Sequence, residues 1–373
     1  MTEQKEQKEQ KEKRRMSTQE VKKLPKDSTF YVLGVVSRFA QRRDKNDNPF
    51  WDISLMDGEG QIDGKIWGSS EWWNISGEAK QKITPADDEI LKSLDGKTVG
   101  VQGKIVAFRD QNQCNFNAVY YVDQEKYPPH SFVRRSPVPM DEMESAFLNI
   151  IETCGQPMRT FLEYIFFDRD VWKAYRTWPA AISMHHAYVS GLLEHSLSVA
   201  RSAISIAQSY KEKDFYIDLD VVIAGALLHD LGKLESYRLS PAPEVTVGGN
   251  VVDHIVMGYH RFMTLVDEYK KTGASAKGVN APAENRILAI GHILVSHHGT
   301  REFGSPVLPS TPEALVVSVA DELDFKLFCW KEHTSQLDGG KEVTEYVPSV
   351  QRRFWKGCPS EKTENETRSE SNG

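Results

Sequence analysis

The sequence lacks any long hydrophobic run. Nowhere in its 373 residues do apolar side chains approach the roughly 18 to 20 consecutive positions that a bilayer-spanning helix needs. The first fifteen residues, MTEQKEQKEQKEKRR, contain no apolar stretch of the kind that a secretory signal requires. We therefore expect no membrane association and a cytoplasmic protein.

Cysteine is scarce, and so is any excess of positive charge. The four cysteines, Cys114, Cys154, Cys329 and Cys358, are widely spaced and form no CxxC pair. This spacing argues against a disulfide framework or a zinc ribbon and indicates reduced thiols. The net charge of -7 argues against a wholly basic nucleic-acid binder, although it leaves room for a local basic groove.

The length of the chain predicts two domains, because single hydrophobic cores stop growing well below 373 residues. Both ends are polar. Residues 1–27 repeat Glu, Gln and Lys, and we predict a disordered charged tail there. Residues 356–373 are equally poor in apolar side chains and form a second predicted disordered tail.

Residues 28–126 show the alternation of period two that is typical of β-strands. The alternating segments lie around Tyr31–Val35, Trp51–Leu55, Ile62–Ile66, Lys97–Phe108 and Asn115–Val122. A helix is predicted between the third and fourth strands, over Glu71–Leu91. Three strands, a helix and two strands follow the element order of a small OB-fold barrel, so the prediction is an OB-fold nucleic-acid-binding domain.

One face of this predicted barrel carries aromatic and basic side chains. If Ile53, Leu55, Ile62 and Ile66 point inward, their neighbours on the strands point outward. Such a face would stack on unpaired bases and neutralise phosphates; its candidate residues are Phe50, Lys65, Trp67, Arg38, Arg42 and Arg43. The alternative is that Trp67, Trp72 and Trp73 simply pack under the predicted helix.

A proline-rich linker should separate the two domains. Residues 127–140 contain YPPHSFVRRSPVP, which has no periodicity, so we expect an extended, surface-lying segment. Residues 141–355 then show apolar side chains at intervals of three and four, with no convincing strand. The second domain is predicted to be an all-α helical bundle.

Within this bundle, histidines and aspartates end or interrupt apolar helical segments. The adjacent pair His229–Asp230 follows the apolar run Ala226–Leu228. A histidine without a partner is costly to bury, so the whole set predicts a metal centre to which five helices bring side chains. Its candidate ligands are His195, His229, Asp230, His254, His297, His298 and Asp321. The alternative is a set of separately satisfied core and surface histidines.

The order H…HD…H…HH…D resembles the HD-domain metal-dependent phosphohydrolases. The longer strings WPAAISMHHAYVSGLLEHSLSVA, HDLGK and SHHGTREFGSP are similar to the YhaM-type 3′-to-5′ exoribonucleases, in which an OB-fold precedes an HD domain. The resemblance implies two ions. The first would take His195, His229, Asp230 and Asp321, and the second would share Asp230 and add the three remaining histidines.

Imidazole and carboxylate ligands without thiolate favour a catalytic divalent ion, with Mn²⁺ preferred and Fe²⁺, Co²⁺ or Zn²⁺ as alternatives. Lys233 is a candidate phosphate contact, or else a solvated lysine at a helix end. Arg301 is a second phosphate candidate. The family string places His185 and His186 in the active site, where they would contact substrate or protonate the leaving group.

These expectations favour a metal-dependent 3′-to-5′ exonuclease that hydrolyses phosphodiester bonds of single-stranded RNA and releases mononucleotides. Single-stranded DNA is a further candidate substrate, and a homo-oligomer is left open. One alternative is a phosphohydrolase or cyclic-nucleotide phosphodiesterase acting on small nucleotides. Another is a non-catalytic nucleic-acid-binding scaffold with an inactive HD core.

Overall fold

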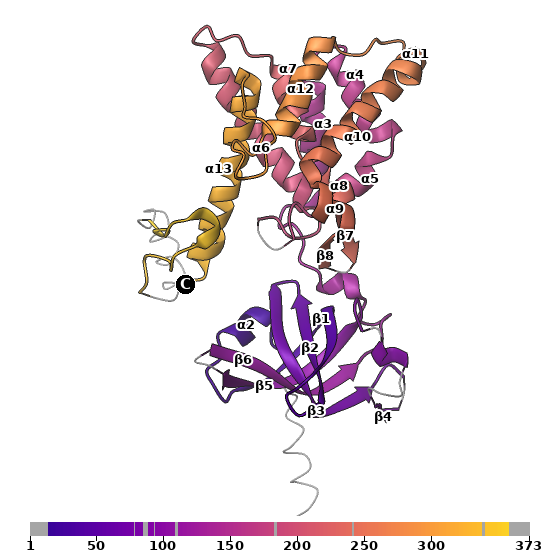
Figure 1. Cartoon of the computed structure of the whole chain (residues 1–373), viewed down its shortest axis with the longest axis vertical. Coiled ribbons are helices and arrows are strands. Elements are labelled where there is room, and N and C mark those ends of the chain that lie inside the picture. Colours follow the sequence, from indigo (N-terminus) through magenta and orange to yellow (C-terminus); the bar gives the residue numbers. More distant parts are fainter. Residues whose placement is uncertain are drawn as a thin grey trace, which may run out of the picture.

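The computed structural model describes residues 14–77, 79–84, 89–92, 94–108, 111–182, 185–240, 242–337 and 340–357. A β-barrel near the N-terminus is followed by a layered group of helices, and both parts are visible in Figure 1. Residues 1–13 and 358–373, which include most of the two predicted disordered tails and Cys358, lie outside the described residues. None of the described helices combines the length and apolar character that a bilayer span requires.

The barrel is built from long, strongly curved strands. They are β1 (Thr29–Arg43), β2 (Pro49–Asp57), β3 (Gly60–Asn74), β4 (Gln81–Lys82), β5 (Thr98–Phe108) and β6 (Gln111–Tyr121). Pairing runs β1–β2–β3–β6–β5–β1, so the sheet closes on itself, with β3–β6 as the parallel pair. This closed topology is that of an OB-fold, as the sequence predicted.

Alternating apolar side chains fill the barrel. Ile53, Leu55, Ile62 and Ile66 are all buried, which confirms the predicted inward face. Gly64 allows the strands to close tightly, because a Cβ there would lie 2.7 Å from the ring of Phe116. The register of β2 and β3 therefore fixes which side chains face outward.

Two predictions about the barrel were wrong. No helix begins at Glu71: β3 continues through Trp72 to Asn74 and pairs with β6, and only a short 3-10 helix, η1 (Glu89–Lys92), follows β4. Residues 78, 85–88 and 93 of the predicted helix lie outside the described residues. This segment forms a strand rather than a helix because Trp72 is a strand-favouring aromatic residue whose side chain packs in the barrel core.

The second error concerns the end of the predicted tail. Residues 18–22 form a helix, α2 (Thr18–Lys22), which begins with a capping box between Ser17 and Glu20. Thr18 donates hydrogen bonds from its backbone N–H and its hydroxyl to Asp57, at 2.8 and 2.7 Å. Val21 enters the barrel core, so this part of the chain is an ordered cover on the barrel.

The linker is packed rather than extended, contrary to the prediction. It contains a 3-10 helix, η2 (Pro129–Phe132), and Phe132 and Val133 are buried. They join an apolar cluster with Leu33, Val35, Met56 and Val122 of the barrel, and Val189 of the helical domain packs against it. The four prolines restrict the chain but leave these apolar side chains free to dock.

The helical domain begins after the linker with α3 (Met140–Glu152), α4 (Met158–Glu163), the π-helix η3 (Tyr164–Asp168) and α5 (Val171–Tyr175). Its central helices are α6 (Gly191–Lys211), α7 (Leu219–Leu228), α10 (His254–Glu268), α12 (Glu284–Ser296) and α13 (Pro312–Ser335). Shorter elements connect these: α8 (Lys233–Ser236), α9 (Val247–Val252), the π-helix η4 (Tyr269–Gly273), α11 (Ala274–Lys277) and the 3-10 helix η5 (Pro348–Val350).

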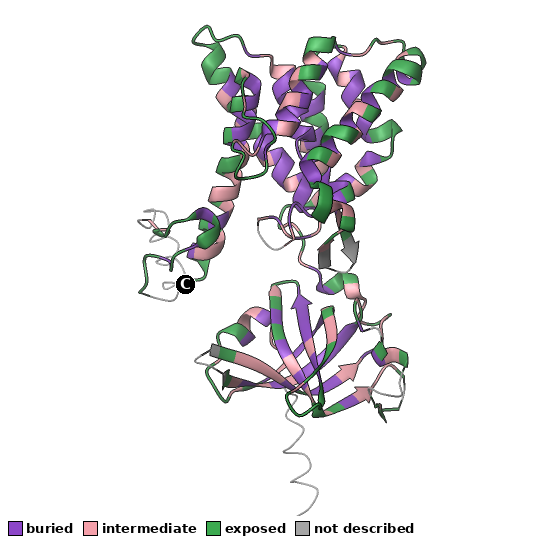
Figure 2. Cartoon of the chain, viewed as in Figure 1, coloured by how far each residue is buried: buried purple, intermediate pink, exposed green. Residues whose placement is uncertain are grey.

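Helix α7 lies at the centre of this domain, and all its residues from Val221 to Leu228 are buried. A helix that is apolar on every side must be surrounded by protein, and Figure 2 shows the buried residues concentrated in the middle of the helical layer. The prediction that this domain is purely helical was wrong in one place. There β7 (Tyr237–Ser240) and β8 (Ala242–Val245) form an antiparallel hairpin. Its two strands are only four residues each, too short for a period of two to be recognised in the sequence.

Candidate metal centre

The predicted ligands converge on the end of α7. His229 and Asp230 follow its last residue, His195 lies in the second turn of α6, and Asp321 lies within α13. His254 begins α10, and His297–His298 follow α12. Gly232 lets α10 approach this turn, since a Cβ there would lie 1.9 Å from the His254 carbonyl oxygen.

Four side chains form a first cluster. The Nε2 atom of His195 lies 3.1 Å from His229 Nε2, 3.5 Å from Asp230 Oδ2 and 3.2 Å from Asp321 Oδ1. His229 Nε2 lies 3.2 Å from the same Asp230 oxygen. Two nitrogens and two carboxylate oxygens therefore point at one another, which is the donor set expected of a divalent ion site.

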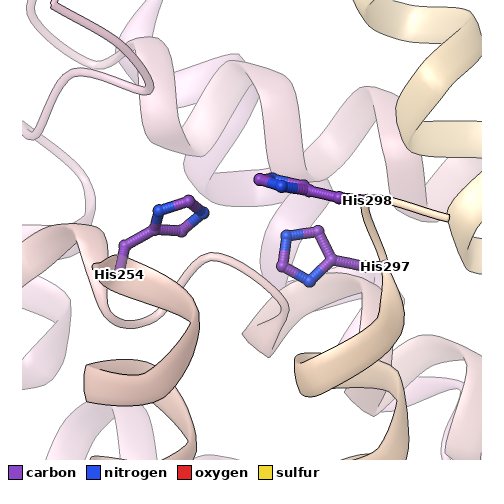
Figure 3. Close-up of side chains that lie close together, drawn as sticks. All are labelled: His254, His297 and His298. Carbon is purple, nitrogen blue, oxygen red and sulfur yellow. The ribbon is translucent and has the colours of Figure 1, made fainter. Parts of the chain in front are cut away.

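The other Asp230 oxygen faces a second cluster. His254, His297 and His298 lie with their rings turned toward one another, from the start of α10 and the end of α12 (Figure 3). Asp230 Oδ1 is 3.6 Å from His254 Nε2 and 3.8 Å from His297 Nε2. These three atoms are buried without a hydrogen-bond partner. Asp230 is thus placed between the two clusters, with one oxygen directed to each.

The opposite ring nitrogen of every histidine in the two clusters has an acceptor. The Nδ1 atoms contact Asp324 Oδ2 (His195, 2.7 Å), Ala226 O (His229, 2.7 Å), Asp253 (His254), Leu294 O (His297, 3.0 Å) and Phe303 O (His298, 2.7 Å). A nitrogen that faces a carbonyl or carboxylate oxygen must carry the proton. In the neutral tautomer each Nε2 therefore presents a lone pair to the centre.

This arrangement fits a cation better than it fits an empty polar core. The Nε2 atoms of His195 and His229 oppose each other at 3.1 Å, a contact that needs either a proton or a metal ion between the two nitrogens. The buried Asp230 Oδ1, His254 Nε2 and His297 Nε2 would each be costly to leave unpaired. Two divalent ions would satisfy all of these atoms.

Several side chains of the centre have pKa values shifted from their ordinary range. Burial acts to raise the pKa of Asp230, but Lys233, His229 and His195 outweigh it and hold that pKa well below its usual range. Burial lowers the pKa of His297 strongly, and that of His298 as well. Burial also acts to lower the pKa of His195, but Asp230, Asp321 and Asp324 outweigh it and raise that pKa well above its usual value, so a metal ion would have to displace a proton there. Ionised carboxylates and neutral imidazoles are the protonation states in which both groups bind metals.

Lys233 lies inside the centre and does not reach solvent. Its side chain is buried, and its ammonium donates to Asp230 Oδ2 at 2.6 Å. Burial would lower the pKa of this lysine, but Asp230 reverses the effect and raises it, so the group stays charged. The structure thus gives Lys233 a contact with a candidate ligand and contradicts the alternative of a solvated lysine at a helix end, while its predicted contact with a phosphate stays a prediction.

His185 and His186, which precede α6, differ in how their ring nitrogens are hydrogen-bonded. Both ring nitrogens of His186 are engaged, Nδ1 with the Tyr188 hydroxyl at 2.7 Å and Nε2 with Asp324 at 3.1 Å. His185 Nδ1 has no hydrogen-bond partner among the residues that the structure describes, and its ring centroid lies 5.2 Å from that of His195. Arg301 is exposed in the turn that follows His298. His185 is therefore the one of the pair with a free nitrogen beside the centre.

Sequence reasoning missed two supporting carboxylates. Asp324 accepts from both His195 and His186, and Asp253 contacts His254. Each had a signal. Asp324 stands three residues after Asp321, on the same face of a helix, and Asp253 directly precedes a predicted ligand.

The predicted nucleic-acid face is assembled on β2 and β3. The rings of Phe50 and Trp67 lie 5.2 Å apart, and the Lys65 ammonium lies 4.9 Å from the Phe50 ring and 5.7 Å from the Trp67 ring. Phe50 is only 8% exposed, because Trp67 and Lys65 lie against it. Trp72 packs in the core against Trp51.

The three predicted arginines on this face all have acidic neighbours. Arg42 pairs with Asp52 at 2.5 Å, Arg43 with Asp47 at 2.9 Å, and Arg38 lies 4.0 Å from Asp63. Their charges are therefore partly balanced within the barrel. Lys65 is the basic side chain of the predicted set that lies directly on the aromatic rings.

Comparison with known proteins places these features in context. Residues 192–326 match the HD domain family. The 3′-5′ exoribonuclease YhaM of Bacillus subtilis is 29% identical over 316 residues, 83% of this chain and 89% of that protein. The YhaM protein of Halalkalibacterium halodurans is 27% identical, over 83% of this chain and 88% of that protein.

Solved structures were also compared. One is the second OB-fold domain of replication protein A from Methanococcus maripaludis, with 14% identity, TM-score 0.19 and coverage of 28% of this chain and 92% of that one. Another is the HD domain of the phosphodiesterase PgpH from L. monocytogenes, with 13% identity, TM-score 0.26 and coverage of 50% and 78%. TM-scores this low carry no argument. By sequence, the chain contains an HD domain and is similar over most of its length to the YhaM 3′-5′ exoribonucleases.

Proposed function

We propose that the protein is a metal-dependent 3′-to-5′ exonuclease that hydrolyses phosphodiester bonds of single-stranded RNA and releases mononucleotides, with single-stranded DNA as a further candidate substrate. The observation that carries the proposal is Asp230, whose two oxygens face two separate histidine clusters. Such a pair of sites suits phosphodiester chemistry, in which the attacking and leaving oxygens both need stabilisation. The similarity to enzymes named 3′-5′ exoribonucleases supports the direction of attack.

His195, His229, Asp230 and Asp321 would hold one ion, and Asp230, His254, His297 and His298 would hold the other. Mn²⁺ suits this set of nitrogen and oxygen donors, with Fe²⁺, Co²⁺ or Zn²⁺ as alternatives. When bound, the ions would supply Lewis acidity and a water of lowered pKa at the scissile phosphate.

The chain's own residues position these groups. Lys233 holds the Asp230 carboxylate, and Asp324 orients His195. The free Nδ1 of His185 is the candidate proton donor to the leaving oxygen, and His186 positions Asp324. Arg301 would contact a phosphate from the exposed turn after His298.

The barrel would hold the strand while the helical domain hydrolyses its end. Trp67 and Lys65 offer an aromatic ring beside a positive charge, with Phe50 packed beneath them, and this suits unpaired bases without selecting among them. This module distinguishes the proposal from a phosphohydrolase acting on small nucleotides, because such a substrate needs no extended contact.

Two further expectations belong to the same proposal. The described cysteines Cys114, Cys154 and Cys329 are free, which is consistent with a cytoplasmic enzyme. Self-association would cover an exposed apolar stripe on α13, where large side chains recur at every fourth position and are about half exposed: Leu315, Val319, Leu323 and Leu327. Ridges of this spacing can pack against the same ridge of a second copy.

The test is digestion of end-labelled single strands in Mn²⁺, in Mg²⁺ and in EDTA. We expect mononucleotide products, no reaction in EDTA, and slower digestion of strands that end in a 3′-phosphate or a stable hairpin. Circular single-stranded RNA should survive. Internal cuts in the circle would identify an endonuclease. Hydrolysis of cyclic or small nucleotides with no action on strands would favour the phosphohydrolase instead.

A further inference from the structure

A second aromatic and basic cluster lies on the barrel, away from Phe50 and Trp67. The ammonium of Lys80 lies 3.9 Å from the centroid of the Trp73 ring and 5.3 Å from that of Tyr120. Trp73 and Tyr120 are register partners on the parallel strands β3 and β6. Lys82, opposite Trp73 on β4, brings a second ammonium to 5.7 Å from the same ring.

Tyr31 extends this cluster across the barrel wall. Its ring centroid is 6.4 Å from that of Tyr120. It lies across Gly100, where a Cβ would come within 2.5 Å of the Tyr31 hydroxyl oxygen. The missing side chain at Gly100 therefore leaves room for an aromatic surface that continues from Trp73 through Tyr120 to Tyr31.

These aromatic rings face away from the barrel core. On β3, Ile66 and Trp72 belong to the core cluster, whereas Trp67 and Trp73 are only partly buried. The two clusters thus share the outer side of one strand. Six residues separate Trp67 from Trp73, which corresponds to at most about 20 Å at ~3.3 Å per residue. The irregularity between Ile66 and Glu71 shortens the direct path, because β3 advances seven residues from Ile66 to Trp73 while β6 advances only four, from Phe116 to Tyr120.

The charges in this second cluster favour a polyanion. Glu71 accepts a hydrogen bond from the Trp73 indole at 3.3 Å and lies 3.7 Å from Lys82, so it balances that lysine in part. Lys80 forms no ion pair with any residue that the structure describes. An exposed ammonium over two rings can contact a phosphate while the rings stack on the adjoining bases.

We propose that Trp73, Tyr120, Tyr31 and Lys80 form a second subsite for single-stranded RNA, on the same outer side of β3 as Phe50 and Trp67. The inference rests on the proposed exonuclease function and adds a second point of contact for the strand. At ~3.4 Å per stacked base, up to about six nucleotides bridge the two clusters, whose separation along β3 is at most about 20 Å. This length lies within the roughly 4 to 16 nucleotides that one OB-fold binds.

The subsite predicts a dependence on strand length. Binding of 3′-labelled U4 and U20 RNA to the full chain is measured by fluorescence anisotropy in EDTA, which withholds divalent ions and prevents hydrolysis. Trp73→Ala should weaken U20 binding by about 5- to 150-fold, the equivalent of one lost base stack. U4 cannot span both clusters, so its affinity should change much less. Trp73→Phe keeps a stacking ring and should recover most of the loss.

Lys80→Gln tests the phosphate contact separately. It should reduce the slope of log affinity against log salt for U20 by about 0.7, the value for one phosphate contact on a single strand. Tyr216→Ala and Lys271→Glu alter exposed side chains of the helical domain and should leave binding unchanged.

Two results would overturn the subsite. One is unchanged U20 affinity in Trp73→Ala, and the other is an equal loss for U4 and U20, since that would mean general damage to the barrel. Hydrolysis of 5′-labelled U20 in Mn²⁺ tests the proposed function independently. If U20 is not hydrolysed by the unmodified protein, the exonuclease assignment fails, whereas the subsite is still judged by the binding of U20 in EDTA.

Discussion

Asp230 illustrates how much of the candidate centre depends on single residues. Its Oδ2 meets the Lys233 ammonium and the first cluster, while its Oδ1 faces His254 and His297 without a hydrogen bond. A carboxylate shares its single negative charge between two acceptor oxygens, so it can serve both sides. An amide offers only one oxygen, and its NH₂ group would face the other cluster as a donor.

We therefore expect Asp230→Asn to lose most of its bound metal and its activity. The loss should exceed the roughly 10- to 100-fold that follows removal of a supporting hydrogen bond. The variant should also melt at a lower temperature, because Lys233 is left buried without its counter-charge, a change that typically costs about 3 to 5 kcal/mol. Metal analysis, RNA digestion and thermal denaturation measure the three effects.

A companion variant separates chemistry from stability. Asp230→Asn combined with Lys233→Met removes the unpaired charge, so the melting temperature should recover while metal and activity stay lost. Asp267→Asn changes an exposed aspartate of α10 and serves as the matched control. Normal turnover in Asp230→Asn would end the two-cluster interpretation.

Asp324 is expected to act on the metal centre indirectly, through the orientation of His195. Its carboxylate orients His195 at 2.7 Å and also accepts from His186. Asp324→Asn should lower metal affinity by about 10- to 100-fold without abolishing activity at saturating Mn²⁺. Titration of metal-free protein with Mn²⁺ gives the affinity. An unchanged titration curve would show that the tautomer of His195 is held by other contacts.

At this scale the sequence was most informative about direct ligands. His229–Asp230 and the histidines at helix ends stood out because buried imidazoles need partners. The contacts of Lys233 with Asp230 and of Asp324 with His195 were not predicted, since a carboxylate or an ammonium on a helix is also common on solvated faces. Which of these groups is buried depends on how α6, α7 and α13 pack.

At the scale of elements, the approach of α10 to the end of α7 brings the two clusters together. The contact is made through Gly232, where even a methyl group would overlap the backbone of His254. Ordinary helix packing through side chains would keep the helix axes roughly 8 to 10 Å apart. Glycine allows the start of α10 to reach the turn that carries Asp230.

Gly232→Ala should therefore displace α10 and weaken the second cluster more than the first. Overpacking of this kind costs about 1 to 3 kcal/mol, which denaturant unfolding can measure. One of the two bound ions should be lost or bound more weakly. Gly58→Ala, at a position where a Cβ meets nothing within 4 Å, provides the control. Retention of two ions with unchanged affinity would contradict this role for Gly232.

The elements themselves were predicted unevenly. The apolar period of long helices such as α6 and α12 is visible in the sequence, and so is the alternation of the barrel strands. The predicted helix over Glu71–Leu91 was wrong because Trp72 and Trp73 are compatible with a helix or a strand. Pairing with β6 makes this segment a strand, and that pairing cannot be recognised in the local sequence. The β7–β8 hairpin is too short for its alternation to be recognised.

At the scale of the molecule, the barrel and the helical domain meet through the linker. Phe132 and Val133 fill an apolar cluster to which β1, β2 and the segment before α6 contribute. An ion pair between Arg134 and Glu332, at 3.0 Å, and a hydrogen bond from Ser136 N to Val189 O join the linker to the helical domain. Length predicted two domains, but proline content suggested a separation that the apolar residues between the prolines prevent.

Phe132→Ala should loosen this junction. Removing a buried phenylalanine side chain typically costs about 3 to 5 kcal/mol, and here that loss falls on the contact between domains. Calorimetry should show one transition for the unmodified protein and two for the variant. Phe215→Ala, which removes an exposed ring of the helical domain, should behave like the unmodified protein. A single transition in Phe132→Ala would mean that other contacts suffice for cooperative unfolding.

The Nδ1 atoms of the five clustered histidines all contact protein acceptors, and this affects how the proposed centre would exchange metal ions. Because their rings are held by protein acceptors before any ion arrives, the proposed centre would exchange one divalent ion for another without refolding. Which ion it holds would then follow the general order of binding strengths and the supply of each metal.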